Sequence, residues 1–384
     1  MLRCPICGRE YEDHGKMRCD CGEPLEFEPF RGRTHTGKSV WERFREFLPV
    51  EPDLNLSLGE GDTPLVKSRL GKELGVRLYL KNETTNPTWS FKDRGTFLGI
   101  LAAIRFGYRN VGTVSTGNMA ASVAAYAARA GLKAHILVPS SIAPEKVRQI
   151  AVYAPWIIKV EGPYGELYYK SLEAGEKEGI YFINSDNPFR IEGYKTISFE
   201  IAEEMSPDYV IVPTSSGGLI RGIIKGFLEL RNSGLVEELP TFIAVQAEGC
   251  SPIHRAFIEG KNRVERFKNP HTVAHAIENP YPPSGNAVLK LLRETGGFTA
   301  AVNDREILKA REELACEGLF VQPASATGIA AVKRLVEEGK IEKGSKVVSV
   351  LTGSGLKTLP ATGPGKVRGC RLEELEDCLK TTGG

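Results

Sequence analysis

From about residue 59 onward, short apolar runs rich in β-branched residues alternate with longer, alanine-rich amphipathic stretches. This alternation is typical of βαβ units, in which each strand of a parallel sheet is followed by a helix that covers one face of the sheet. No segment recurs at the period of about 20–50 residues that marks a solenoid. We therefore expect an α/β fold with open twisted sheets.

The same alternation locates the individual elements. The predicted strands are Val76–Leu80, Asn110–Thr113, Lys133–Val138, Ile157–Val160, Tyr181–Ile183, Tyr209–Val212, Thr241–Gln246 and Lys346–Leu351. The predicted helices are Phe97–Phe106, Met119–Ala130, Pro144–Tyr153, Gly165–Glu178, Gly193–Met205, Gly218–Leu230, Asp304–Glu317 and Thr327–Glu338.

Length and charge limit the classes of function. The chain has 384 residues, enough for two or three folded units, because single cores rarely grow beyond about 250–300 residues. Its 50 basic and 48 acidic residues give a formal charge of +2, so no global field attracts nucleic acid or a membrane. Small-molecule chemistry is the expected function. The N-terminal MLRCPICGRE lacks the apolar core of a secretory signal, which predicts a cytoplasmic protein.

Half of the eight cysteines lie within the first 21 residues: Cys4, Cys7, Cys19 and Cys21. Gly8 and Gly22 allow tight turns that place two thiolates each on one side, so the four sulfurs can close a tetrahedron around zinc. Four unliganded cysteines are the alternative, but a segment of about 25 residues has too little apolar surface to fold without a metal. We expect a structural zinc ribbon at 1–28, followed by a linker at 29–58.

The stretch NPTWSFKDRG places Lys92 just before a helix expected to begin near Thr96. At a helix N-terminus the dipole disfavours a protonated amine, so such a lysine becomes nucleophilic and can form a Schiff base. Lysines at helix starts are more often simply solvated, and the position alone leaves both interpretations open.

Three polar, glycine-rich turns follow predicted strands, at 115–118, 214–219 and 352–357. The first two precede helices, where backbone N–H groups can hold a phosphate or carboxylate. For Ser115 and Asn118, simple capping of the helix is an equally good explanation. None of the turns matches a dinucleotide or ATP-phosphate motif. Open α/β sheets bind ligands at this carboxyl edge.

Taken in order, these stretches resemble the fold type II pyridoxal-phosphate enzymes, and within that family they are most similar to the threonine synthases. The motifs on which this resemblance rests are NPTWSFKDRG, STGN at 115–118, NSDNPFRIEGYKT at 184–196, QPASA at 322–326 and LTGSGLK at 351–357. The resemblance runs from Leu58 to about Lys357. It implies a two-domain tryptophan synthase β-like fold, with 59–105 and 190–384 in a larger cofactor-binding domain and 106–189 in a smaller α/β domain.

The resemblance also implies roles for single residues. Lys92 carries pyridoxal 5'-phosphate as a Schiff base, Asn118 contacts the pyridine oxygen, and Thr352 meets the ring nitrogen. Backbone amides hold the cofactor phosphate at Ser215, Ser216, Gly217, Gly218 and Leu219. Asp93 and Arg94 are expected to be structural only.

A threonine synthase must bind a second phosphate, that of O-phosphohomoserine, before it releases threonine and phosphate. A guanidinium can grip phosphate through two hydrogen bonds, which makes Arg190 the informative residue, although a surface arginine in a salt bridge is the ordinary alternative. Ser185 lies in the same matched segment. The remaining substrate-binding residues implied by the resemblance are Ser115 and Thr116.

Several positions depart from the family pattern. Trp89 stands where the family usually has glycine, and Met119 replaces the common threonine or alanine. Alternatives therefore remain: a cysteate synthase acting on O-phosphoserine and sulfite, a serine or threonine dehydratase, or a non-catalytic zinc-ribbon adaptor. The intact Lys92 and the near-neutral charge oppose the adaptor. By resemblance we expect a homodimer.

Overall fold

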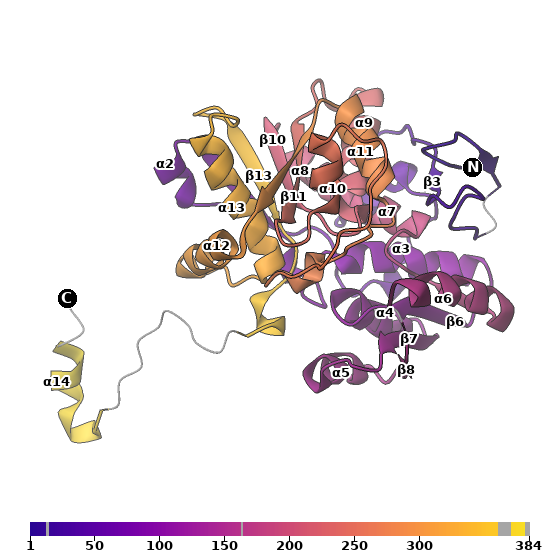
Figure 1. Cartoon of the computed structure of the whole chain (residues 1–384), viewed down its shortest axis with the longest axis horizontal. Coiled ribbons are helices and arrows are strands. Elements are labelled where there is room, and N and C mark those ends of the chain that lie inside the picture. The colour runs from indigo at the N-terminus through magenta and orange to yellow at the C-terminus, as the bar shows by residue number, and fades with distance from the viewer. Residues whose placement is uncertain (13–14, 163, 360–369, 381–384) are drawn as a thin grey trace.

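The computed structural model describes residues 1–12, 15–162, 164–359 and 370–380. Two open sheets form the body, and a small three-stranded sheet packs beside them at the N-terminus (Figure 1). The α/β prediction is confirmed. Among the described residues, none of the helices has the length and apolarity needed to cross a bilayer.

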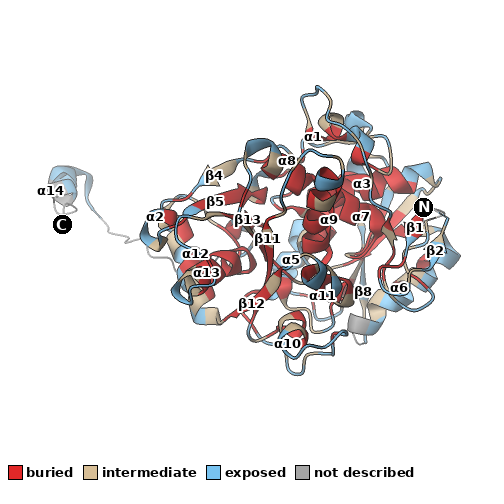
Figure 2. Ribbon diagram, turned by 90° about the horizontal axis from the view of Figure 1, so that it is seen from above, coloured by how far each residue is buried: buried red, intermediate tan, exposed pale blue. Residues whose placement is uncertain are grey.

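The larger sheet has six strands in the order β12-β11-β10-β13-β5-β4. All neighbours are parallel except β4, which runs antiparallel to β5 at one edge. Its central strands are buried almost throughout and covered by helices on both faces (Figure 2). The strands are β4 (Leu65–Lys67), β5 (Arg77–Asn82), β10 (Tyr209–Pro213), β11 (Thr241–Ala247), β12 (Phe298–Val302) and β13 (Lys346–Leu351).

The smaller body sheet has four parallel strands in the order β8-β7-β6-β9. They are β6 (Asn110–Val114), β7 (Lys133–Pro139), β8 (Trp156–Val160) and β9 (Ile180–Phe182). All four fall within the segment that we assign to a smaller domain. The division into domains itself stays a prediction.

The α-helices of the described residues follow the strands in the βα order that the pattern predicted. They are α1 (Val40–Arg43), α2 (Leu70–Leu74), α3 (Lys92–Arg105), α4 (Asn118–Arg129), α5 (Pro144–Ala151), α6 (Tyr164–Glu178), α7 (Pro188–Tyr194), α8 (Thr196–Glu204), α9 (Gly218–Asn232), α10 (Pro252–Ile258), α11 (Gly285–Glu294), α12 (Asp304–Cys316), α13 (Pro323–Glu337) and α14 (Leu375–Lys380).

Two element boundaries differ from the sequence prediction in ways that matter for the site. Helix α3 begins at Lys92 rather than near Thr96, because its first turn buries Asp93 and Arg94 among polar partners instead of solvent. The single helix expected over 193–205 is two helices, α7 and α8, joined at Lys195. Apolar periodicity does not reveal either feature, since both depend on buried polar contacts.

The segment predicted as a linker at 29–58 packs into the body. Trp41, Phe44 and Phe47 are each at most 1% exposed. The Phe44 ring stacks on Phe199 at 4.5 Å, and the Trp41 ring lies 4.9 Å from that of Phe97. Prolines and scattered charges suggested a linker, but three buried aromatic side chains make this stretch part of the core.

The N-terminal sheet has the order β2-β1-β3 and antiparallel pairing. Its strands have only two residues each: β1 (Leu2–Arg3), β2 (Glu10–Tyr11) and β3 (Glu26–Phe27). The Phe27 ring meets Phe189 of α7 edge-on at 4.9 Å. This contact seats the ribbon on the body.

Candidate active site

The predicted site turns meet at the carboxyl edge of the six-stranded sheet. The lysine motif follows β5, the 214–219 turn follows β10, and the 352–357 turn follows β13. Strands β5 and β13 are neighbours, as are β13 and β10, so the three turns lie side by side. The N-terminus of α4 joins them, because the Asn118 amide donates to the side-chain oxygen of Gln322 at 2.8 Å.

The Lys92 amine lies among aromatic rings at the start of α3. Its Nζ is 4.3 Å from the Phe91 ring centroid and 5.8 Å from that of Tyr194. Burial, aided by the positive charge of Arg190, lowers the pKa of Lys92 from 10.5 to about 7. About half of the amine is then neutral near pH 7, and the neutral form is the one that attacks an aldehyde.

Backbone pairing fixes the lysine motif against the 352–357 turn. The Phe91 amide donates to the Thr352 carbonyl at 3.2 Å, and the Ser354 amide donates to the Trp89 carbonyl at 3.0 Å. Trp89 adopts a left-handed backbone conformation, with φ of 62°, while its side chain is half exposed. That conformation favours glycine, so the residue common in the family is the less strained one here.

Asp93 and Arg94 act inside the protein rather than at the site. The Asp93 carboxylate accepts from the Thr88 amide at 2.6 Å, and burial raises its pKa. The fully buried Arg94 guanidinium binds the carboxylates of Glu83 and Glu200. These contacts anchor the first turn of α3 and thereby hold Lys92 in place.

Two hydroxyl groups lie together where β13 ends. The hydroxyls of Thr352 and Ser325 are 2.9 Å apart, and Ser325 also accepts from the Gly353 amide at 3.0 Å. A Cβ atom at Gly353 would lie 2.8 Å from the Gln322 side-chain oxygen and 3.1 Å from the Asn118 amide nitrogen. Thr352, Gly353 and Asn118 therefore converge on one small region.

The 214–219 turn presents the open N-terminus of a long helix. Gly217 has a left-handed φ of 91°, and no side chain among the described residues caps α9. A Cβ atom at Gly218 would lie 2.8 Å from the Ser185 carbonyl oxygen, so this turn touches the 184–190 segment directly. The uncapped N–H groups of Gly218 and Leu219 are available to an anion.

Arg190 is fully buried beside Lys92. Its guanidinium donates to the Tyr194 hydroxyl at 2.6 and 2.9 Å, to the Thr96 hydroxyl at 2.9 Å and to the Lys92 carbonyl at 3.3 Å. All of these partners are neutral. Within the described part of the chain, no carboxylate forms an ion pair with it, so the surface salt bridge considered as its alternative is absent.

The other two predicted substrate-binding residues lie at the turn between β6 and α4. The Ser115 hydroxyl accepts from the Gly117 amide at 3.3 Å. Thr116 is half-buried in the same turn. Neither side chain caps α4, whose N-cap is Gly117. The capping interpretation of Ser115 is therefore not realised, and its hydroxyl shapes the turn instead.

The residues present fit pyridoxal phosphate. The cofactor aldehyde can bond to the Lys92 amine, whose pKa is lowered. The cofactor phosphate suits the uncapped helix N-terminus at Gly218. The pyridine nitrogen suits the paired hydroxyls of Thr352 and Ser325. Three neighbours that the sequence gave no role are Tyr194, Gln322 and Ser325. All three lie inside matched motifs, which was the available signal.

The four N-terminal cysteines form a compact cluster. Their sulfur atoms all lie within 4.8 Å of one another, with Cys4 and Cys21 3.6 Å apart and Cys7 and Cys19 3.5 Å apart. A tetrahedral zinc with sulfur at about 2.3 Å needs S–S separations near 3.8 Å. Gly8 and Gly22 adopt left-handed φ values of 75° and 88° in the two turns. The cluster is compatible with a closed four-thiolate metal site.

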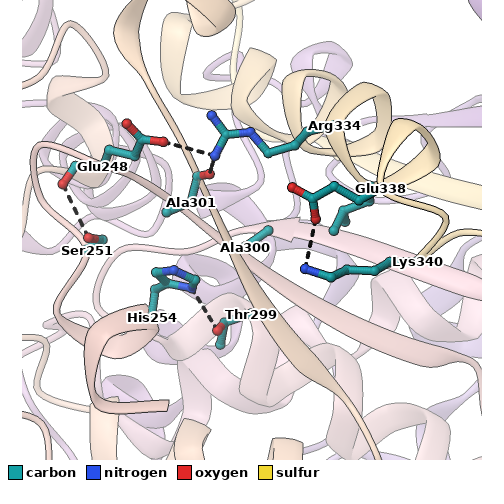
Figure 3. Close-up of a pocket in the computed structure, with 10 residues that line it drawn as sticks. Glu248, Ser251, His254, Thr299, Ala300, Ala301, Arg334, Glu338 and Lys340 are labelled. Atoms are coloured by element: carbon teal, nitrogen blue, oxygen red, sulfur yellow. Dashed lines mark hydrogen bonds and ion pairs between the residues drawn. The ribbon is translucent and has the colours of Figure 1, made fainter. Parts of the chain in front are cut away.

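A polar cavity of about 300 Å³ lies at the β12 edge of the large sheet (Figure 3). Its charged groups neutralise one another: Arg334 binds Glu248 at 2.9 Å, and Lys340 binds Glu338 at 2.8 Å. None of the predicted site residues lines it. This cavity is therefore separate from the site around Lys92.

Comparison with known proteins identifies the family. The family model described as pyridoxal-phosphate dependent enzyme matches residues 56–353. The threonine synthase of Methanocaldococcus jannaschii is 41% identical over 376 residues, 93% of each chain. The threonine synthase of Halalkalibacterium halodurans is 39% identical, over 83% of this chain and 90% of its own.

Solved structures agree in fold. Threonine deaminase isoform 2 from Solanum lycopersicum superposes with a TM-score of 0.69 at 22% identity, over 93% of this chain and 97% of that chain. Maize serine racemase superposes with a TM-score of 0.66 at 23% identity, over 83% of this chain and 92% of that chain. At such identities these matches speak for the fold alone.

Proposed function

Since this chain belongs to the family of pyridoxal-phosphate dependent enzymes, we propose that it is a threonine synthase. It converts O-phospho-L-homoserine and water to L-threonine and phosphate, by γ-elimination and β-addition. The observation that supports this choice of substrate is the position of Arg190. Its guanidinium is fully buried beside Lys92 and has only neutral hydrogen-bond partners. A buried cation without a counter-ion is costly, and a substrate phosphate supplies the missing charge.

We assign the cofactor seat from the family resemblance, and the geometry described above supports it. Lys92 holds the cofactor aldehyde, the amides of 215–219 hold its phosphate, Asn118 contacts the pyridine oxygen and Thr352 the ring nitrogen. Ser325 orients the Thr352 hydroxyl through their 2.9 Å contact. When bound, pyridoxal phosphate supplies the electron sink that stabilises a carbanion next to the substrate nitrogen.

The protein groups then divide the remaining work. The amine of Lys92 removes the proton from the substrate α-carbon, and its lowered pKa suits it to accept a proton near neutral pH. Arg190, Ser185, Ser115 and Thr116 bind the substrate phosphate and receive it as the leaving group. A second proton leaves the β-carbon as the γ-phosphate departs, and a proton is then added at the γ-carbon. Water adds its hydroxyl at the β-carbon, and return of a proton to the α-carbon completes threonine.

Further assignments complete the proposal. Zinc occupies the Cys4, Cys7, Cys19 and Cys21 cluster, where four thiolates leave no open coordination position, so the metal is structural. The enzyme acts as a cytoplasmic homodimer. Residues 59–105 and 190–384 form the larger cofactor-binding domain, and 106–189 the smaller domain.

The deciding assay supplies purified holoenzyme with O-phosphohomoserine, and separately with O-phosphoserine plus sulfite. We expect threonine and phosphate in equal amounts from the first and no product from the second. The Lys92→Ala variant is the control, because it lacks the amine that both bonds the cofactor and moves the proton. Product from the second mixture alone would refute the threonine synthase assignment while leaving the cofactor chemistry intact.

A further inference from the structure

We propose that Arg18 of the N-terminal ribbon is a positioning residue for the substrate phosphate site. Its guanidinium forms an ion pair with Asp186, the neighbour of Ser185 in the 184–190 segment. This inference rests on the proposed function, because it concerns the seat that we assign to the substrate phosphate. It adds a role for the ribbon beyond structural metal binding.

The ribbon is attached to the body by polar contacts as well as by Phe27. The Lys225 amine donates to the Phe27 carbonyl at 2.5 Å, and the Lys290 amine donates to the Pro5 carbonyl at 2.7 Å. Figure 1 shows the ribbon beside α6, α7 and α9. It therefore contacts elements on which both phosphate seats are built.

Arg18 is held from two sides. Its side chain is 14% exposed, while that of Asp186 is 1% exposed. Besides Asp186 it binds the Gly22 carbonyl within its own ribbon, and it lies 5.3 Å from the Tyr169 ring of α6. A cavity of about 50 Å³ lined by Arg18, Tyr169 and residues 281–283 marks where ribbon and body meet.

Arg18 and its Gly22 partner flank the second cysteine pair. Arg18 directly precedes Cys19, and its Gly22 partner directly follows Cys21. The Gly22 amide in turn donates to the Cys19 carbonyl at 2.8 Å. Hydrogen bonds within the second cysteine turn thus hold the guanidinium where it faces the body.

Asp186 transmits this position to the substrate seat. Asn187 follows it and caps α7 by accepting from the Phe189 amide at 3.0 Å, and α7 carries Arg190. On its other side, the Ser185 carbonyl packs against Gly218. A shift of Asp186 therefore moves both predicted phosphate-binding residues of this segment.

A second ribbon contact supports the same arrangement. Arg221, the other cation whose charge acts on Asp186, binds Glu26 of the ribbon at 2.8 Å and the Ser284 hydroxyl at 2.9 Å. The Ser284 amide donates to the Ser216 carbonyl at 3.0 Å. The ribbon is thus connected to the segments that carry both proposed phosphate seats, most directly to the substrate seat through Arg18.

Loss of Arg18 leaves a carboxylate buried without its nearest counter-ion, and the segment must rearrange to hydrate or protonate it. The expected defect is weaker phosphate binding with little change in the chemical step. A residue with a merely structural role would lower stability without this selective effect.

The test compares Arg18→Met with Arg9→Met in the zinc-loaded holoenzyme. Arg9 is the matched control: like Arg18 it is a ribbon arginine paired with an aspartate, but its partner Asp20 lies within the ribbon and both side chains are more than half exposed. Three quantities are measured: the KM for O-phosphohomoserine, the turnover number, and the dissociation constant of inorganic phosphate. Cofactor fluorescence reports the binding of inorganic phosphate.

For Arg18→Met we expect both constants to rise about tenfold, the size of coupling typical of networked residues. The turnover number should stay within about twofold, the signature of lost binding rather than lost catalysis. Arg9→Met should match the wild-type enzyme. Arg18→Lys, which keeps the charge, should recover part of the affinity.

If the KM and the phosphate dissociation constant of Arg18→Met equal those of Arg9→Met, the inference is overturned. Should Arg18→Met fail to fold, the Arg18→Met/Asp186→Asn variant removes both charges together, and weaker phosphate binding than in Arg9→Met supports the inference, while equal binding overturns it. A wild-type enzyme that forms no threonine defeats the proposed function instead. The inorganic-phosphate measurement needs no turnover, so it still decides the role of Arg18.

Discussion

At the scale of single residues, the chemistry depends on how burial changes one amine. The Lys92 pKa of about 7 results first from its burial and second from the Arg190 charge. An ordinary lysine is almost fully protonated at this pH, whereas Lys92 is about half neutral. The surroundings of Lys92 therefore make its amine nucleophilic even without bound cofactor.

The pH dependence of cofactor capture follows from that shift. Only the neutral amine attacks the aldehyde, so capture of added pyridoxal phosphate by the apoenzyme should rise with pH through a midpoint near 7. Arg190→Gln removes one of the two causes of the low pKa, so its midpoint should move upward. Borohydride trapping across a pH series measures both midpoints. A wild-type midpoint near the ordinary lysine value of 10.5 would contradict this account.

Trp89 provides a second prediction at this scale. A left-handed conformation costs a non-glycine residue about 1–2 kcal/mol, which glycine avoids, while the greater flexibility of glycine in the unfolded chain offsets about 0.5–1 kcal/mol of this stabilisation. Trp89→Gly should therefore increase the free energy of unfolding by up to about 1.5 kcal/mol. Denaturant titration of the apoenzyme measures it.

Trp156 is the matched control, since it is also an exposed tryptophan but lies in strand β8 with ordinary backbone geometry. Trp156→Gly should lower the free energy of unfolding, because glycine weakens a strand. If both substitutions destabilise the protein equally, backbone strain at Trp89 is not the cause.

At the scale of elements, helix α9 joins the two proposed phosphate seats. Gly218 begins the helix and leaves no room for a side chain beside the Ser185 carbonyl. Gly218→Ala should push the 184–190 segment away and weaken cofactor binding about tenfold, the usual consequence of a misplaced binding shell. Cofactor affinity is measured by titrating the apoenzyme with pyridoxal phosphate.

Ser215→Ala serves as the control in the same turn. It removes a hydroxyl but keeps the backbone amides that we assign to the cofactor phosphate, so its cofactor affinity should stay near that of the wild-type enzyme. A large loss of cofactor affinity in Ser215→Ala would show that the Ser215 side chain, not the backbone, holds the cofactor phosphate.

At the scale of the whole molecule, the ribbon depends on its proposed metal. Strands of two residues have almost no core of their own, and a structural zinc supplies about 10 kcal/mol or more to such modules. Cys4→Ser/Cys19→Ser should lose one zinc per chain, expose the N-terminus to proteolysis and weaken inorganic-phosphate binding as Arg18→Met does. The Lys92 chromophore should remain.

Zinc content, limited proteolysis, the dissociation constant of inorganic phosphate and absorbance measure these four outcomes. Cys316→Ser is the control, because Cys316 is an exposed cysteine at the end of α12, far along the chain from the cluster. Unchanged zinc content in the Cys4→Ser/Cys19→Ser variant would refute the metal site.

By itself, the sequence determined what neighbouring residues encode. The βα alternation, the glycine-rich turn at 214–219, the two cysteine turns and the lysine motif are all local patterns, and the structure has them where the sequence predicted them. Strands β4 and β12 escaped prediction because one has three residues and the other is rich in alanine. The first turn of α3 was missed because its polar residues are buried.

Only the tertiary structure decided which distant residues meet. Arg190 reaches the Lys92 carbonyl across 98 positions, Asn118 meets Gln322 across 204, and Arg18 meets Asp186 across 168. The burial of residues 29–58, which the sequence predicted to be a linker, also depends on contacts with distant parts of the chain. These contacts arise when strand order brings loops to one sheet edge and excludes water from them, and both strand order and water exclusion are properties of the folded whole.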